Sequence, residues 1–386
     1  MPVVGADDVI LLGAPLSLSG KYAREGLHVR NGYDFAIRKI NDKGGVKVGG
    51  RRHKLALRYY DDASAPIRAT ELAERLIKQD GVKFMLGPYG SVQTKAVLPV
   101  IERHKVPLVQ GNGEARELFT RGSRYHFAVL STSDQYLTPV IEFAAGHAGK
   151  LGKTKESLRI ALAMADEQFA QDVRAGLLDL IMRQGMNVVV DDQLPPELDD
   201  MSFTLKRVKA LKPDLLLISG REQGALTAVT QIRELRVDVP VIAMTHCKTA
   251  GIAEKLGAAA EYVLCTHQWH RSLQHKDELF GTAEDFAQEF ERTHNYEAPD
   301  EAAQAAASVQ VFADAIGRAQ SLDAETVRKA IAATELQTFY GPIKFDAAGR
   351  NIAKSMVLTQ IQNGKHVSIS ATPSAAGTPF VPRSLD

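Results

Sequence analysis

The chain has 386 residues, 45% of them apolar and 24% charged, which is an ordinary globular composition and a length that favours two domains. Because 47 Lys and Arg residues balance 46 Asp and Glu residues, the net charge of +1 gives no support for nucleic acid or an anionic membrane as a partner. No apolar run approaches the ~20 residues of a membrane span. The opening MPVVGADDVI lacks the features of a signal peptide, so both a mature exported chain and a cytoplasmic start stay open.

The first third alternates strand-length apolar runs with stretches of helical periodicity. In the stretch 26–45, Val29, Tyr33 and Ile37 recur at helical spacing, and a Gly pair ends the pattern. Pro99 lies inside another helical stretch and predicts a kink or an early end there. The expected strands are 9–14, 54–62, 82–87 and 106–113, and the expected helices are 26–45, 68–81 and 91–105.

A second series of the same kind follows from about residue 158. Strand and helix patterns alternate through 158–185, 186–195, 202–220, 222–247 and 260–270. Such alternation predicts parallel sheets with helices on both faces, occurring twice, which is an α/β fold of two Rossmann-like lobes. The last third predicts three helices, then a strand, then a hairpin around Asn363-Gly364. The Pro-, Ser- and Ala-rich tail from residue 371 is expected to be irregular or to cover other elements.

The stretch MLGPYGSVQT, residues 85–94, indicates a strand, a tight Gly turn and a helix, the arrangement that offers backbone N–H groups to an anion. It lacks the Lys-Ser/Thr ending of a phosphate loop, and no dinucleotide fingerprint occurs. Ser91 is expected to cap the helix. The next strand ends in QGNGE, so Ser91, Asn112, Gly113 and Glu114 are expected to line one crevice, although ordinary loops would give the same pattern.

The sequence gives weak support for a hydrolase site or a metal site. No G-x-S-x-G elbow occurs, and Ser, His and Asp are too abundant to define a triad. His246-Cys247 and Cys265-Thr266-His267 each end a predicted strand, but their spacing fits no zinc motif, so two buried cysteines with His at a rim are preferred. One disulfide is possible, and its formation stays open. Trp269 is preferred as core filler over a wall beside a crossover.

The ordered series VILLGAPLSLSGKYAREG, GYDFAIRKINDKGGV, LRYYDDASAPIRATELAERLI, MLGPYGSVQT, KVPLVQGNGEARELFTRG, ALAMADEQFAQDV and TFYGPIKFDAAG resembles one family. It is that of the type I periplasmic solute-binding proteins of ABC transporters, in the branched-chain amino acid branch. The resemblance covers nearly the whole chain. It implies two lobes that close on a ligand about a hinge, with crossovers near 131–134, 266–269 and 340–344. The lobes would then be 1–131 with 268–340, and 132–267 with 341–386.

The resemblance also implies ligand roles, all of them binding and none catalytic. Ser91, in the turn that holds Tyr89, would hold a ligand carboxylate with the neighbouring backbone, and the pair Asn112 and Glu114 would face the ligand from the next loop. Tyr22 would border the cleft. The second lobe would contribute Phe169, Arg221 and His246.

Departures from the family pattern leave the ligand open. Amino acid binders of the family use a hydroxyl where this chain has Glu114, and they place an acid near His246, where this chain has none. The missing acid, with Arg221 and His246 making the second lobe less acidic, fits a carboxylate without an amine, such as an aromatic or aliphatic acid, whereas Glu114 points the other way. Glu114 favours a cation or a partner, which Arg116 or Arg221 could supply.

The expected function is a periplasmic, monomeric solute-binding protein that delivers a small carboxylate-bearing ligand, an amino acid or an aromatic or aliphatic acid, to a membrane permease. It needs no cofactor or metal and catalyses nothing. The alternative is a cytoplasmic sensor of the same fold that regulates a partner protein. An enzyme is the least favoured possibility, because nothing assembles a nucleophile, a base and an oxyanion site.

Overall fold

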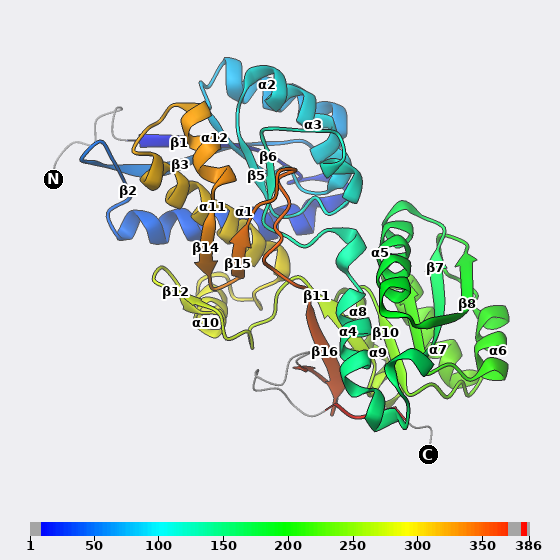
Figure 1. Cartoon of the computed structure of the whole chain (residues 1–386). Coiled ribbons are helices and arrows are strands. Elements are labelled where there is room, and N and C mark those ends of the chain that lie inside the picture. Colours follow the sequence, from blue (N-terminus) through cyan, green and yellow to red (C-terminus); the bar gives the residue numbers. More distant parts are fainter. Residues whose placement is uncertain (1–8, 370–379, 384–386) are drawn as a thin grey trace. The chain divides into compact units, whose positions relative to one another are not determined.

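A computed structural model describes residues 9–369 and 380–383 of the chain (Figure 1). The chain divides into two units, of which the first comprises Met1–Ser131 and Trp269–Lys354 and the second Thr132–Gln268 and Ser355–Asp386. Each unit is an α/β layer structure built on its own sheet. The predicted chain start and most of the predicted irregular tail lie outside the described residues. Within the described ranges, no helix is long and apolar enough to cross a membrane.

The first unit is built on a six-stranded sheet in the order β2-β3-β1-β4-β5-β6. Its neighbouring strands run parallel except for the β2–β3 pair. The strands are β1 (Val9–Leu16), β2 (Val46–Val48), β3 (Arg51–Asp61), β4 (Phe84–Leu86), β5 (Leu108–Gln110) and β6 (His126–Ala128). The helices are α1 (Ala23–Asp42), α2 (Pro66–Lys78), α3 (Ser91–His104), α10 (Ala283–His294), α11 (Asp300–Ala319) and α12 (Ala324–Ala332). Two small hairpins complete the unit: β12 (Lys276–Asp277) with β13 (Gly281–Thr282), and β14 (Glu335–Thr338) with β15 (Gly341–Lys344).

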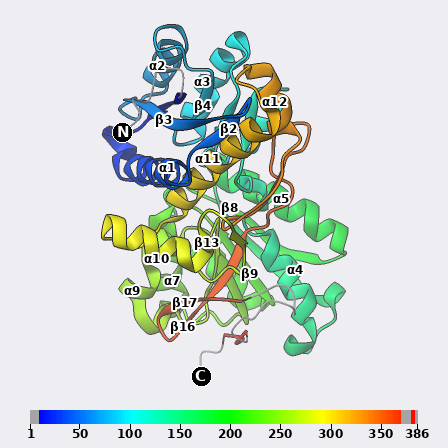
Figure 2. The ribbon, with the colours of Figure 1, turned by 90° about the vertical axis from the view of Figure 1, so that its left-hand side faces the viewer.

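The two faces of this sheet are covered by different helices, as the alternation of β1 requires. Ile10, Leu12 and Ala14 pack into the core formed with α1 and α11, whereas Leu11 packs against the core formed with α2 and α3. The helices α1 and α11 lie against each other (Figure 2). At Gly32 an added Cβ would stand 2.3 Å from the carbonyl oxygen of Ala302. A larger residue at position 32 would therefore separate these helices.

The second unit is built on a seven-stranded sheet in the order β17-β16-β11-β10-β9-β7-β8. Its strands run parallel except for the β11–β16 and β16–β17 pairs. The strands are β7 (Arg159–Ala165), β8 (Asn187–Leu194), β9 (Leu215–Ser219), β10 (Val241–Met244), β11 (Leu264–His267), β16 (Val357–Gln362) and β17 (Lys365–Ser368). The helices are α4 (Thr138–His147), α5 (Gln168–Gln184), α6 (Ser202–Leu211), α7 (Glu222–Glu234), α8 (Cys247–Ala250) and α9 (Ile252–Leu256). The cores on its two faces hold α4 with α5, and α6 with α7.

The predicted elements recur in the structure with small shifts of their ends. The predicted hairpin is confirmed: β16 and β17 are joined by Asn363 and Gly364, both at positive φ. Of the two outcomes expected at Pro99, a kink or an early end of the helix, the early end is wrong, because α3 continues to His104. The residues predicted as a single strand at 336–350 form the β14–β15 hairpin instead. Trp269 is core filler, 3% exposed and packed against Phe286.

The chain passes for the third time between the two units after Lys354, whereas the resemblance implied that this crossover lies near 340–344. The intervening residues are tied to the first unit by pairing and hydrogen bonds. Strand β15 pairs with β14, the amide of Ala128 donates to the carbonyl of Gly349, and Asn351 Nδ2 donates to the carbonyl of Val129 at 2.9 Å. The chain therefore leaves the first unit only after this segment.

Candidate functional site

In the first unit, the loops that follow β1, β4 and β5 lie at one edge of the sheet, because these strands are neighbours and run parallel. The turn after β4 is held by its glycines. Gly87 has a φ of 69° and donates its N–H to the Tyr33 hydroxyl at 3.0 Å, and Gly90 has a φ of 86°. Gly90 is also the N-cap of α3, so the predicted capping role of Ser91 is wrong. Ser91 is instead the first residue of the helix.

The side chain of Ser91 joins this turn to the loop after β5. Its Oγ accepts the backbone N–H groups of Glu114 and Ala115, both at 3.0 Å. A hydroxyl oxygen offers two acceptor positions and one proton. Both acceptor positions of Ser91 are therefore occupied, and the capacity that remains is to donate its proton.

The loop after β5 is organised by a side chain that the sequence reading did not single out. Gln110 is fully buried, and its Oε1 accepts the N–H groups of Asn112 at 2.7 Å and Gly113 at 2.6 Å. Gln110 Nε2 donates to the carbonyl of Gly113 at 3.0 Å. The backbone N–H groups from Asn112 to Ala115 are thus used within the protein. The backbone N–H groups expected to help Ser91 hold an anion must therefore come from another segment, and the first turn of α3 is the candidate.

Tyr22, after β1, and Tyr89, after β4, meet at this edge with ring centroids 5.5 Å apart. Burial is the largest cause that raises the pKa of Tyr89 well above its ordinary value, and three nearby carboxylates raise it further, those of Glu301, Glu25 and Glu114. Tyr89 therefore stays a neutral hydroxyl group at physiological pH. The edge is rich in negative charge.

Residues from the last third of the chain also reach this region, and the sequence reading missed them. Tyr340 is fully buried, and the Nζ atom of Lys354 lies 4.7 Å from the centre of its ring. Burial lowers the pKa of Lys354 to about 7, against the opposing charge of Asp300. Burial also raises the pKa of Tyr340 well above its ordinary value, with Asp300 and Glu114 adding to the effect. No local motif marks these residues, because they come close only through the packing of α11 and the β14–β15 hairpin.

In the second unit, Phe169, Arg221 and His246 follow β7, β9 and β10, which are also parallel neighbours. The ring centroids of Phe169 and His246 lie 5.1 Å apart, and those of Phe169 and Tyr136 lie 5.0 Å apart. Arg221 is largely exposed and pairs with Glu167 at 3.2 Å. Glu167 also caps α5 by accepting the N–H of Ala170. The structure thus brings the predicted aromatic and imidazole groups together and directs the Arg221 guanidinium to a carboxylate of its own unit.

His246 adopts a left-handed conformation with a φ of 59° at the start of α8. Burial lowers its pKa to about 4, although a hydrogen bond to the backbone of Gly220 acts in the opposite direction. His246 is therefore neutral at neutral pH. A neutral imidazole beside a phenyl ring adds no charge to this face.

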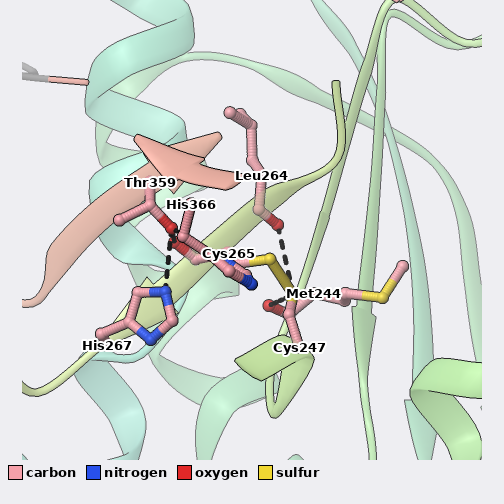
Figure 3. The surroundings of a disulfide bond; sticks show 7 residues. All are labelled: Met244, Cys247, Leu264, Cys265, His267, Thr359 and His366. Atoms are coloured by element: carbon pink, nitrogen blue, oxygen red, sulfur yellow. Dashed lines mark hydrogen bonds between the residues drawn. A yellow bond between two sulfur atoms is a disulfide. The ribbon is translucent and has the colours of Figure 1, made fainter. Parts of the chain in front are cut away.

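Cys247 and Cys265 form a disulfide, with Cα atoms 5.8 Å apart (Figure 3). Both are buried, and Met244, the last residue of β10, is the strand partner of Cys265. The bridge therefore ties the turn that carries His246 to the neighbouring strand β11. Neither sulfur is a free thiolate, so the pair does not offer metal ligands. His267 is buried and bonds to Thr359 Oγ1 at 2.8 Å rather than standing at a rim (Figure 3).

The family model for periplasmic binding proteins matches residues 9–365, so the chain belongs to the periplasmic binding protein family. A Leu/Ile/Val-binding protein of Rhizobium johnstonii is 29% identical over 242 residues, and this match spans 62% of each chain, less than two thirds of that relative. A Leu/Ile/Val-binding protein homologue of Brucella suis is 24% identical over 373 residues, which cover 93% of this chain and 91% of that one.

Two solved structures show the same fold. A branched-chain amino acid transporter substrate-binding protein of Streptococcus pneumoniae, in complex with isoleucine, has a TM-score of 0.71 and 20% identity, covering 93% of this chain and 97% of that one. A solute-binding protein of Rhodopseudomonas palustris, in complex with 3,4-dihydroxybenzoic acid, has a TM-score of 0.72 and 19% identity, covering 94% and 96%. The fold is thus that of the type I periplasmic binding proteins.

Proposed function

We propose that this chain is the substrate-binding component of an ABC transporter and that it captures a small carboxylate-bearing ligand, an amino acid or an aromatic or aliphatic acid. The family assignment supports the class of protein. The ligands of the two structural neighbours, isoleucine and 3,4-dihydroxybenzoic acid, each carry a carboxyl group, which supports the class of ligand. The ligand would be held by closure of the two units, and a membrane permease would receive it. The protein would act as a monomer without cofactor, metal or catalysis.

The observation that carries the proposal is the hydrogen bonding of Ser91. Because its oxygen accepts two backbone N–H groups at 3.0 Å, its proton is committed to donation. A donor fixed in this way loses little freedom when it meets a carboxylate. The first-turn N–H groups of α3 stand beside it and carry the positive end of the helix dipole. Together they form a set of donors suited to one carboxylate.

The remaining candidate residues would shape the rest of the ligand site. Tyr22 and Tyr89 would offer aromatic faces and hydroxyl groups, and Asn112, Gly113 and Glu114 would line the neighbouring loop. From the second unit, Phe169 and neutral His246 would supply an apolar wall, with Arg221 at its margin. A mostly apolar wall with few placed polar groups is the usual composition of a small-molecule site.

The disulfide supports an oxidising compartment and hence the periplasm. The alternative is a cytoplasmic sensor of the same fold that regulates a partner protein. Such a sensor would keep both cysteines reduced in the cell. Trapping free thiols with a maleimide at the moment of cell lysis separates the two: modified Cys247 and Cys265 would favour the sensor.

A thermal-shift screen tests the ligand class. The panel contains L-leucine, L-isoleucine, benzoate and 3,4-dihydroxybenzoate, together with isoamylamine and toluene, which lack the carboxyl group. A ligand at 100 times its dissociation constant stabilises the folded state by about 2.7 kcal/mol, so a true ligand raises the melting temperature clearly. Stabilisation by at least one acid and not by its analogue without a carboxyl group is the expected result. Equal stabilisation by acid and analogue would contradict a carboxylate site.

A further inference from the structure

A cavity of about 250 Å³ lies in the first unit, and none of the candidate site residues lines it. Its walls come from residues between 123 and 127 at the start of β6, from Arg328 and Ala332 on α12, and from residues between 345 and 349 after β15. Because β4, β5 and β6 are parallel neighbours, the start of β6 lies at the opposite edge of the sheet from Ser91, which follows the end of β4. The cavity is therefore separate from the site proposed above.

One wall of the cavity is apolar. Phe127 and Phe345 are 3% and 6% exposed, and their ring centroids lie 5.3 Å apart. The exposed residues Ala332 and Ala347 also line the cavity. An apolar cavity of about 150 Å³ can hold benzene, so this cavity has room for a ring or a branched chain together with a polar head group.

Two arginine side chains bring positive charge to the cavity. The side chain of Arg328 is 14% exposed, and its Nε and Nη2 donate to Glu325 Oε1 at 3.0 and 2.9 Å. Its Nη1 makes no hydrogen bond to any residue that the structure describes. Arg124 is exposed, and among residues 9–369 and 380–383 its guanidinium has no ion-pair partner. Its backbone N–H donates to Glu102 Oε1 at 2.7 Å, which fixes the loop that carries it.

The carboxylates that line or border the cavity already have partners. Asp346, which lines it, accepts Arg350 Nε at Oδ2 and backbone N–H groups at Oδ1, all at 2.9 Å. Glu325, which pairs with Arg328, also accepts the Tyr125 hydroxyl at 2.7 Å. An anion in the cavity therefore meets guanidinium N–H groups and no unmatched carboxylate among the described residues that line it.

We propose that this cavity is a second binding site, for a small organic anion that carries one carboxylate on an apolar ring or branched chain. Nη1 of Arg328 and the guanidinium of Arg124 hold the carboxylate, because planar guanidinium groups match its two oxygens. The apolar body lies on Phe127 and Phe345, and a pocket that is mostly apolar and carries few charged groups suits such a ligand. This second site exists whether or not Ser91 binds a carboxylate.

Crystals grown with 4-iodobenzoate test the place of binding, because anomalous scattering locates the iodine atom. Iodobenzene, which lacks the carboxylate, is the comparison. We expect an iodine position in the cavity beside Phe127 and Phe345 with 4-iodobenzoate and none with iodobenzene. The absence of iodine from the cavity with 4-iodobenzoate, or equal occupancy by both compounds, overturns the proposal.

Calorimetric titration with 4-iodobenzoate tests binding in solution with two pairs of variants. Ala332→Trp fills the cavity, whereas Ala333→Trp places the same side chain on the neighbouring exposed residue, which does not line it. Arg124→Gln removes a charge from the cavity, whereas Arg121→Gln removes one from an exposed position outside it. We expect Ala332→Trp to abolish binding in the cavity and Arg124→Gln to weaken it about tenfold or more, because a hydrogen bond between charged groups is lost. Both controls should bind like the wild type.

The variant Ser91→Ala separates this cavity from the candidate site, which could also take 4-iodobenzoate. The heat of binding in the cavity should persist in Ser91→Ala and disappear in Ala332→Trp. Heat that disappears in Ser91→Ala and persists in Ala332→Trp belongs to the candidate site and overturns the proposal. An iodine position in the crystal without binding in solution is binding at crystal concentration only, and it overturns the proposal as well.

Discussion

Replacing Ser91 by alanine removes one oxygen that has two tasks in the structure. In the free protein the oxygen accepts the N–H groups of Glu114 and Ala115, and in the proposed complex its proton is donated to the ligand carboxylate. The two tasks affect two different measurements. The first changes the free energy of unfolding, and the second changes the dissociation constant of the ligand.

The size of each effect follows from the bonds that are lost. A hydrogen bond to a charged group contributes about 1.5–3 kcal/mol, which corresponds to a dissociation constant roughly 10- to 150-fold weaker. The two accepted N–H bonds contribute about 0.5–1.5 kcal/mol each, and because they are partly buried, water replaces some of the loss. We therefore expect Ser91→Ala to lower the free energy of unfolding by roughly 1–2 kcal/mol.

Isothermal titration calorimetry with the acid that best stabilises the wild type measures the dissociation constant, and urea unfolding without ligand measures the free energy of unfolding. Ser202→Ala is the matched control. Ser202 is also the first residue of a helix, α6, and its hydroxyl bonds to Asp200 at 3.1 Å, in the second unit. This control should lose stability without losing affinity. If Ser91→Ala loses stability but binds as tightly as Ser202→Ala does, Ser91 organises the loop only, and the reasoning about its proton is refuted.

Three further predictions concern stability. Because the pKa of His246 is lowered to about 4 from an ordinary value of 6.5, the unfolded chain binds the proton more readily, so stability should be full above pH 6.5 and fall as the pH drops toward 4. Asparagine tolerates positive φ, so His246→Asn should reduce this dependence of stability on pH in urea unfolding at pH 7, 6 and 5. An unchanged dependence would exclude His246 as its source. Replacing Cys247 and Cys265 by serine should lower the free energy of unfolding by about 2–4 kcal/mol in the same assay, since the two residues are 18 apart in the sequence. A variant without the bridge that is as stable as the wild type under non-reducing conditions would contradict this. Gly32→Ala should destabilise the first unit by about 1–3 kcal/mol because its Cβ would meet the Ala302 carbonyl at 2.3 Å. In the control Gly317→Ala, the atom nearest to the added Cβ is 3.9 Å away, so this variant should be neutral or stabilising. Equal melting temperatures for the two variants would count against close packing of α1 and α11.

Periodicity and turn chemistry in the sequence were sufficient for the two α/β lobes and for most elements. The helix at α1 follows from Val29, Tyr33 and Ile37, and the hairpin at β16–β17 follows from Asn363-Gly364, because both signals act over a few residues. The edge of the first sheet that gathers Ser91, Asn112, Gly113 and Glu114 also follows, since loops after neighbouring parallel strands lie at one edge.

Tertiary structure decided what those residues do with their hydrogen bonds. Whether Ser91 caps its own helix or binds the next loop depends on the distance between two loops, which no local pattern encodes. The same holds for the Cys247–Cys265 bridge, for the first-unit membership of the segment up to Lys354, and for the hydrogen bond between Asn112 and Gln304, which lie 192 residues apart. Sequence alone thus determined the class of fold and the edge of the sheet, because periodicity is local. The donors that remain for a ligand were decided by packing between distant segments, because a hydrogen bond requires its two atoms to meet.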